Sequence, residues 1–465
     1  MALGLAGCGG DDSSPEPARA DAPNVILVLT DDQDAASLQQ MPYVGGHFAA
    51  GAHAFREAFV TTPECCPSRA SFLTGEYAHN HGVLSNDPKD GGFNSFQDDS
   101  DLPVWLHDAG YRTGFVGKYL NGYGWTALDN DPGYVPLGWD SWAALTNHTE
   151  YQLYDYDLNV GGDIEHYGSG PADYQTTVLG GKAERFISAG PKQKPFFLFL
   201  APSAPHDEGV LEGKEAARNP RPAPQDEGAF GDAALPRPPS FNEADVNDKP
   251  RFVRREPLLR KAQIDRLQTL YRSRLESLLA VDRMVKGLVA ELRQSGELDN
   301  TVIFFASDNG YLLGEHRLEG KDRVYEESVR IPLLVHGAGF SPGVDSKHLV
   351  ANIDFAPTVL DLAGLKQPET VDGESLRRID DDWRRSLLLE VPQDRGFAAV
   401  RTADRLFADY FDGGTELYDL KRDPAELENV RKDADYAKVI ERLDPILGSL
   451  EKCAGEECRR AGRAG

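Results

Sequence analysis

The sequence predicts an α/β fold in which a mostly parallel β-sheet is covered by helices on both faces. Two observations support this prediction. First, five short segments are apolar at nearly every position, which is typical of strands buried on both faces; they are residues 24–30, 111–117, 195–201, 301–307 and 331–337. Second, segments with the period of a helix occur among them. Strands that alternate with helices in this way usually form parallel sheets.

Two helices are visible in the pattern of apolar residues. Such residues recur at helical spacing from Ile264 to Leu292, and Gly296 suits the left-handed residue that closes a helix. A shorter helix is predicted over residues 354–362, and it is again followed by a glycine, Gly364.

The pattern weakens after about Lys366. Residues 397–410 and 416–420 are predicted to form short strands and residues 436–450 a helix, so we expect a small C-terminal α+β subdomain. The chain is therefore divided into a leader and tether (1–23), a main domain (24–365) with a loop insertion (207–257), and the C-terminal subdomain (366–465). The insertion is rich in Pro, Asp and Glu and has no periodicity, as is usual for surface loops.

The overall charge excludes one class of function. Acidic residues number 75 against 49 basic residues, which gives a net charge of −26. A chain this acidic does not bind nucleic acid through a general basic surface. An anionic substrate therefore requires a local basic pocket.

The N-terminus suggests export. Leu5-Ala-Gly-Cys8 resembles the processing site of bacterial lipoproteins, in which the cysteine is lipidated, although only seven residues precede Cys8. We expect a protein anchored by lipid at the bacterial cell surface or in the periplasm. In that compartment Cys453 and Cys458 could pair.

Polar residues follow four of the five predicted strands. Asp31-Asp32 and Asp308-Asn309 come directly after two of them, Lys118 follows a third, and His206 lies five residues beyond a fourth. Ligands bind at this edge of doubly wound sheets. Oxygen ligands select hard cations such as Ca²⁺ or Mg²⁺. Turns and helix caps also favour Asp and Asn, so either pair alone proves little.

A second group of candidate residues lies in Cys65-Cys66-Pro67-Ser68-Arg69. Pro67 suits an early helical position, so the cysteines are expected at a helix N-terminus, where an anion is stabilised. Arg69 adds a planar charged group that matches oxyanions. A buried structural cysteine and a reactive-thiol enzyme are the alternatives.

Cys65-x-Pro-Ser-Arg, followed by Leu73-Thr-Gly75, resembles the signature of type I sulfatases. Other segments resemble the family in the same order: Asp31-Asp32, Gly117-Lys118, Asp308-Asn309-Gly310 and Lys321 with Tyr325-Glu326. The resemblance implies an alkaline-phosphatase-like fold. It also implies that a formylglycine-generating enzyme converts Cys65 to Cα-formylglycine, whose hydrate attacks the sulfur of a sulfate ester.

The same resemblance implies roles for individual residues. Asp31, Asp32, Asp308 and Asn309, together with residue 65, would bind Ca²⁺ or Mg²⁺. Arg69, Lys118 and Lys321 would stabilise negative charge in the transition state. Lys321 and His206 would contact the sulfate ester and protonate the leaving oxygen.

Within the family, the segments around Cys65, His79 and Lys118 resemble the N-acetylglucosamine-6-sulfatase branch. Leu120 stands where many arylsulfatases have a histidine, so His81 and His148 are the candidate substrate-binding residues that could replace it. The expected substrate is a sulfated sugar such as 6-O-sulfated N-acetylglucosamine.

Two other functions remain open. A phosphonate or phosphate monoester hydrolase on the same scaffold would share the metal and the formylglycine, although the acidity of the chain disfavours the more highly charged phosphate. A non-catalytic lipoprotein that binds sulfated glycans would need no nucleophile, metal or lysine set.

Overall fold

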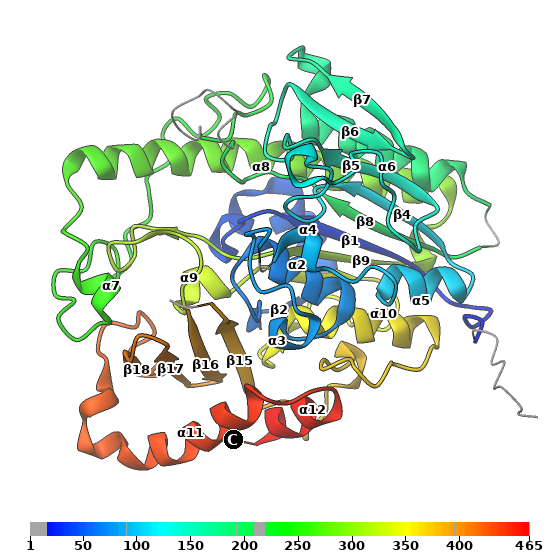
Figure 1. Cartoon of the computed structure of the whole chain (residues 1–465). Coiled ribbons are helices and arrows are strands. Elements are labelled where there is room, and N and C mark those ends of the chain that lie inside the picture. Colours follow the sequence, from blue (N-terminus) through cyan, green and yellow to red (C-terminus); the bar gives the residue numbers. More distant parts are fainter. Residues whose placement is uncertain (1–15, 90, 192–193, 209–218, 394–395, 465) are drawn as a thin grey trace, which may run out of the picture.

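A computed structural model of the chain describes residues 16–89, 91–191, 194–208, 219–393 and 396–464 (Figure 1). Cys8 and the proposed leader up to residue 15 lie outside these ranges. Within the described ranges, no helix has the length and apolar character that crossing a bilayer requires.

The central sheet has ten strands among the described residues. Five of them, in the order β9-β1-β8-β4-β5, run parallel, whereas β12 pairs antiparallel with β9, and β6 and β7 extend the other side as antiparallel strands. All five predicted strands are present, and the mostly parallel sheet is confirmed. Across the sheet the strands are β13 (Asp345–Ser346), β2 (His53–Phe55), β12 (Leu333–His336), β9 (Thr301–Ser307), β1 (Asn24–Thr30), β8 (Phe196–Ala201), β4 (Arg112–Gly117), β5 (Ser141–Thr146), β6 (Tyr156–Val160) and β7 (Asp163–Tyr167).

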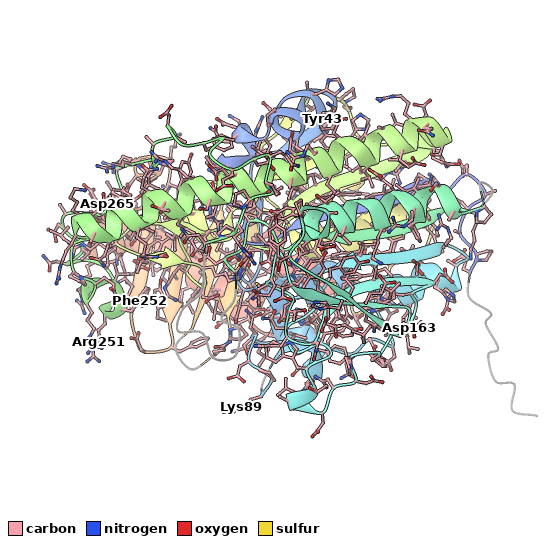
Figure 2. All side chains as sticks on the ribbon, turned by 90° about the horizontal axis from the view of Figure 1, so that it is seen from above. Tyr43, Lys89, Asp163, Arg251, Phe252 and Asp265 are labelled. Atoms are coloured by element: carbon pink, nitrogen blue, oxygen red, sulfur yellow. A yellow bond between two sulfur atoms is a disulfide. The ribbon has the colours of Figure 1, made fainter. Side chains whose placement is uncertain are left out.

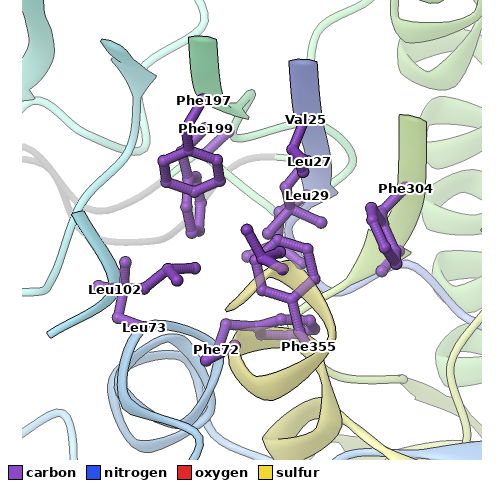
Figure 3. Close-up of a cluster of buried hydrophobic side chains, with 14 of the residues drawn as sticks. Val25, Leu27, Leu29, Phe72, Leu73, Leu102, Phe197, Phe199, Phe304 and Phe355 are labelled. Carbon is purple, nitrogen blue, oxygen red and sulfur yellow. The ribbon is translucent and has the colours of Figure 1, made fainter. Parts of the chain in front are cut away.

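Helices cover both faces of this sheet. Successive residues of a strand point to opposite sides, so a strand that is apolar throughout presents an apolar surface on each face. Val25, Leu27 and Leu29 of β1 face α2 (Cys65–Thr74), α5 (Leu102–Asp108) and α10 (Phe355–Ala363), where Phe72 and Phe355 complete the packing (Figure 3). Burial of each such side chain stabilises the folded state by about 1.5–3 kcal/mol relative to leaving it exposed to water.

The opposite face of the sheet packs against two long helices. The intervening β1 residues Ile26 and Val28 contact α6 (Gln175–Ala189) and α8 (Lys261–Ser295). These helices lie side by side across the sheet when the molecule is seen from above (Figure 2). Gly296 and Gly364 close α8 and α10 in the left-handed conformation, with φ of 77° and 78°, as the sequence predicts.

The C-terminal region forms a second, antiparallel sheet, so the predicted small α+β subdomain is also confirmed. Its four strands, in order, are β15 (Ser386–Val391), β16 (Phe397–Thr402), β17 (Arg405–Tyr410) and β18 (Thr415–Asp419). They pack against α11 (Ala437–Leu450) and α12 (Glu456–Arg463). Residues 397–410 are two strands joined by a tight turn, and Cys453 and Cys458 form a disulfide.

The described part of the loop insertion covers α8 and a neighbouring loop. It contains one short helix, α7 (Arg251–Arg254), whose Arg251 and Phe252 lie at the edge of the molecule (Figure 2). Asp226 accepts two hydrogen bonds of 2.5 Å from Arg283 of α8. The backbone carbonyl of Ser240 accepts a hydrogen bond from the amide of His316. These contacts hold the insertion against α8 and against the loop that contains His316.

Candidate active site

Two neighbouring parallel strands deliver four polar residues to one place. β1 ends at Thr30 and β9 at Ser307, which are paired in register, so Asp31-Asp32 and Asp308-Asn309 emerge side by side. The amide of Asp32 donates to Asp308 Oδ1 at 3.0 Å, and Asn309 Nδ2 donates to Asp32 Oδ1 at 2.7 Å. All four residues are buried.

Cys65 is the first residue of α2 and reaches this group. Its Sγ lies 3.5 Å from Asp31 Oδ1 and 2.8 Å from Lys321 Nζ. The preceding residue Glu64 is extended, so the chain turns into the helix directly at the cysteine. Cys66 points elsewhere, since its Sγ accepts a hydrogen bond from the amide of Asn121 at 2.9 Å. The two adjacent cysteines therefore have different surroundings.

Three cations surround the carboxylates. Lys118 Nζ lies 2.5 Å from Asp31 Oδ2, and Lys321 Nζ lies 2.5 Å from Asp32 Oδ1. Arg69 Nε donates to Asp308 Oδ2 at 2.9 Å, and its Nη1 donates to the Lys118 carbonyl at 2.6 Å. These cations provide the local positive charge that an anionic substrate would require in so acidic a chain. The Arg69 guanidinium is thus held by two carboxylates and a backbone carbonyl, and it orients these groups; its predicted role in stabilising the transition state stays a prediction.

His206 lies at the edge of the group. Its Nε2 is 3.5 Å from Asp32 Oδ2, and its Nδ1 is 2.6 Å from the carbonyl of Asp207, so Nδ1 donates this hydrogen bond. The structure thus brings together Cys65, Lys118, Lys321 and His206 around the paired carboxylates.

The charges of this cluster follow from burial and pairing. Burial alone would raise the pKa of Asp31, but Lys118, His206 and Arg69 hold it below its usual range. Burial opposes the charge of Lys321, yet Asp32 and the other anions raise its pKa well above its ordinary value. Burial and the Asp31 carboxylate raise the pKa of the Cys65 thiol.

The family of the chain is decided by its similarity to known proteins. Residues 23–365 match the family described as sulfatase. The chain belongs to the sulfatase family. Residues 314–452 also match the domain described as N-sulphoglucosamine sulphohydrolase, C-terminal.

Relatives of this sulfatase extend over nearly its whole length. It is 34% identical over 495 residues to N-acetylglucosamine-6-sulfatase of Homo sapiens, with 95% of this chain and 86% of the relative aligned. An arylsulfatase of Volvox carteri is 32% identical, with 94% and 75% aligned. A solved structure in complex with its substrate D-glucosamine-2-N,6-O-disulfate matches with a TM-score of 0.77 and 26% identity, covering 94% of this chain and 98% of that one. These matches confirm the alkaline-phosphatase-like fold and identify a sulfuric ester hydrolase.

The two histidines predicted to bind substrate have different positions in the sulfatase. His81 is buried, its Nε2 lies 3.1 Å from Ser71 Oγ, and its Nδ1 accepts the amide of Val83 at 3.1 Å. Burial lowers its pKa to about 3. His81 is therefore a packed neutral side chain, and the structure does not bring it to the cluster. His148 is exposed, and its ring centroid lies 4.0 Å from that of Trp125 in an edge-to-face arrangement. Its role stays a prediction.

Two residues that the sequence analysis missed contact the cluster. The Tyr151 ring lies 4.2 Å from Lys118 Nζ and 4.2 Å from the His206 ring. Arg274 of α8 is buried and donates to the backbone carbonyls of Asp32 and Pro205. Arg274 occupies the otherwise apolar face of its helix, which is a signal that could have identified it; Tyr151 has no comparable signal.

The donor set suits a metal ion. Ligand atoms of Asp31, Asp32, Cys65 and His206 lie within 4.8 Å of one another. Asn309 Oδ1 is buried and has no hydrogen-bond partner among the described residues, so one more oxygen is free to bind a cation. Lys118, Lys321 and Arg69 pair with the three buried carboxylates, and the oxygen atoms of these carboxylates remain suitable ligands for a hard cation. The residues present therefore fit the metal that the family implies.

Proposed function

We propose that this sulfatase removes the 6-O-sulfate of an N-acetylglucosamine residue in a sulfated sugar. The observation that carries the proposal is the placement of Cys65 Sγ between Lys321 and Asp31 at the start of α2. The substrate class is supported by the name of the human relative, which is 34% identical over 95% of this chain. The bound sugar of the solved relative belongs to the same chemical class.

We propose further that Cys65 is the residue converted to Cα-formylglycine. The modified side chain supplies a hydrated aldehyde, with one hydroxyl to attack sulfur and another whose deprotonation releases sulfate. Lys321 Nζ is within hydrogen-bonding distance of the Cys65 side-chain atom, so it can orient an oxygen there. Cys66 keeps its contact with Asn121 and remains a thiol.

Asp31, Asp32, Asp308 and Asn309 would hold the metal, which we propose to be Ca²⁺ with Mg²⁺ as the alternative. When bound, such an ion acts as a Lewis acid and lowers the pKa of the nucleophilic hydroxyl. The oxygen donors of these four residues favour a hard cation. Arg69 contributes by fixing the Asp308 and Asp31 carboxylates.

The remaining cations act on the substrate. Lys118 and Lys321 offset the charge that develops on the sulfuryl oxygens. The ammonium group of Lys321 carries protons and provides the one that a poor alkoxide leaving group needs, while His206 at the less buried edge of the cluster contacts the sulfate ester. We propose His148 as a contact for the sugar, because it is exposed on the loop that leads to Tyr151.

We also propose that the protein is exported and lipid-anchored through Cys8. The Cys453–Cys458 disulfide supports an oxidising compartment. Cys8 itself lies outside the described residues.

The test is a comparison of kcat/KM for 6-sulfated N-acetylglucosamine, an aryl sulfate and phenylphosphonate. Protein is produced in cells that contain a formylglycine-generating enzyme. Aryl sulfates carry an activated leaving group, so their hydrolysis alone supports only the general sulfatase activity. The proposal fails if the sugar sulfate is not hydrolysed while aryl sulfate is. Preference for phenylphosphonate would favour the phosphonate hydrolase alternative.

A further inference from the structure

A second cluster of metal-ligating side chains lies where the catalytic region meets the C-terminal sheet. It consists of His316, Glu327 and Glu426, one ligand atom of each lying within 4.8 Å of the others. His316 is in the loop between β10 (Leu312–Leu313) and β11 (Glu319–Gly320), and Glu327 is in α9 (Glu326–Val329). Glu426 follows β18 in the C-terminal subdomain.

All three side chains offer a buried atom that nothing in the described part of the chain uses. His316 Nε2, Glu327 Oε2 and Glu426 Oε1 are buried, and none has a hydrogen-bond partner among the described residues. The exposed fraction is 0% for His316 and 1% for Glu426. Leaving a buried polar atom unpaired costs about 1–3 kcal/mol, so three at one place indicate a missing ligand.

The histidine is oriented in the way that metal-bound histidines are. Its Nδ1 lies 2.7 Å from Glu243 Oε2, and Glu243 is itself 3.5 Å from Lys249 Nζ. A carboxylate that accepts from Nδ1–H leaves the lone pair of Nε2 free, and metal-binding histidines usually have such a partner. The ring also stacks on Tyr325 at 4.2 Å, which fixes its plane.

The carboxylates lack the ion pairs that their neighbours have. Glu326 contacts Arg401 at 2.8 Å and Arg330 at 3.7 Å. Among the described residues, Glu327 and Glu426 form no ion pair with a cationic side chain. A bound dication would neutralise both of these groups, which are costly to bury unpaired.

We propose that His316, Glu327 and Glu426 form a second divalent-cation site that takes zinc or a similar first-row transition metal. One imidazole nitrogen and two carboxylate oxygens are donors that suit Zn²⁺ better than the all-oxygen set preferred by Ca²⁺. Ligands held about 2 Å from one zinc ion lie roughly 3–4 Å apart, so the three atoms need only small movements.

An entry path and a structural role follow from the surroundings. Glu327 lines a cavity of about 660 Å³ that Asp34, Glu315 and Arg401 also line, so an ion would approach the buried ligand atoms from the side of Glu327. The ion would join the loop of His316, which leads five residues later to Lys321, to the C-terminal subdomain through Glu426. The site therefore stabilises the loop that carries a catalytic lysine.

The experiment measures zinc directly in the full chain. Metal-free protein is supplied with Ca²⁺ and then titrated with Zn²⁺, and bound zinc is determined by elemental analysis. Crystals soaked in Zn²⁺ are examined for anomalous scattering at the zinc edge. We expect one zinc ion among the three ligand atoms and a thermal unfolding temperature raised by roughly 2–4 °C.

Variants distinguish this site from the catalytic cluster. Glu327→Gln and Glu426→Gln should weaken zinc binding by at least about 10²-fold. Asp34→Asn, which removes a carboxylate that lines the same cavity as Glu327, should bind zinc normally, as should Asp308→Asn in the catalytic cluster. The proposal is overturned if wild-type crystals show no anomalous peak between the three atoms, or zinc only at Asp31 and Asp32. A second outcome would also overturn the proposal. If neither the wild type nor the two glutamine variants bind zinc, and the variants unfold at a temperature equal to or above that of the wild type, then a proton neutralises the Glu327–Glu426 pair instead.

Discussion

Lys321 Nζ lies 2.8 Å from Cys65 Sγ, although 256 residues separate them in the chain. The same ammonium group contacts Asp32 Oδ1 at 2.5 Å. One lysine thus connects the proposed nucleophile position at the start of α2 to a proposed metal ligand at the end of β1. Its placement depends on the loop after β11, which only the folded chain brings to this point.

Replacing Lys321 should therefore impair turnover more than binding. Lys321→Met is expected to lower kcat on the order of 10²–10³-fold, because a preorganised cation is lost where negative charge develops. Steady-state kinetics on a sulfated sugar provide the measurement. Lys182→Met, which removes a lysine paired with Glu165 far from the cluster, is the matched control and should retain activity. An unchanged kcat for Lys321→Met would contradict the assigned role.

The two cysteines should behave differently. Cys65→Ala is expected to abolish turnover, whereas Cys66→Ala should retain most of it, because Cys66 contacts Asn121 instead of the carboxylates. Peptide mass spectrometry of active wild-type protein should show an aldehyde at position 65 and a thiol at position 66. Active protein with wholly unmodified Cys65 would exclude formylglycine chemistry.

Removal of the catalytic metal should abolish activity reversibly. Treatment with a chelator should stop turnover, and Ca²⁺ or Mg²⁺ should restore it, since the donors around Asp31 and Asp308 are mainly oxygen atoms. Asp308→Asn should need a higher metal concentration for half-maximal activity. Recovery with Zn²⁺ alone, or full activity without a divalent ion, would rule out this assignment.

Arg274 should support the site without touching the substrate. Its guanidinium donates to the backbone carbonyl of Asp32, which is a proposed metal ligand, and to that of Pro205, which precedes His206. Arg274→Met keeps much of the side-chain volume but removes these hydrogen bonds. We expect about a tenfold loss in kcat with weaker metal binding, measured by metal titration together with kinetics. Loss of thermal stability with normal metal affinity and kcat would indicate a purely structural residue.

The His79–Glu390 pair should make stability depend on pH. Burial opposes the charge of His79, but the hydrogen bond and charge of Glu390 and the carbonyl of Cys453 raise its pKa to about 9. Because the folded-state pKa exceeds the unfolded one, the stabilisation is complete below about pH 6.5 and is lost as pH rises through about 9. His79→Gln should therefore cost on the order of 1–2 kcal/mol near pH 6 and much less near pH 10. Thermal unfolding at both pH values tests this, and an equal loss at the two values would contradict it.

The sequence by itself determined the elements that have a local signal. The strands at 24–30 and 301–307 are apolar throughout, the apolar residues of α8 recur at helical spacing, and Gly296 and Gly364 close helices. Each of these features is encoded by residues close together in the chain. The segment around Cys65 was sufficient to indicate the family. It also placed Cys65 at a helix N-terminus, where α2 begins.

Only the tertiary structure decided which of the candidate residues meet. His81 and Cys65 lie in one short stretch of sequence, yet His81 packs against Ser71 inside the protein while Lys321, far away in sequence, reaches Cys65. Arg274 and Tyr151 contact the site from a distant helix and a loop, and the three unpaired atoms of His316, Glu327 and Glu426 come from separate segments. Such contacts are set by the crossing of helices and the register of neighbouring strands. Many of them join positions from tens to hundreds of residues apart, such as Lys118 with Tyr151 and Cys65 with Lys321, for which no local pattern exists.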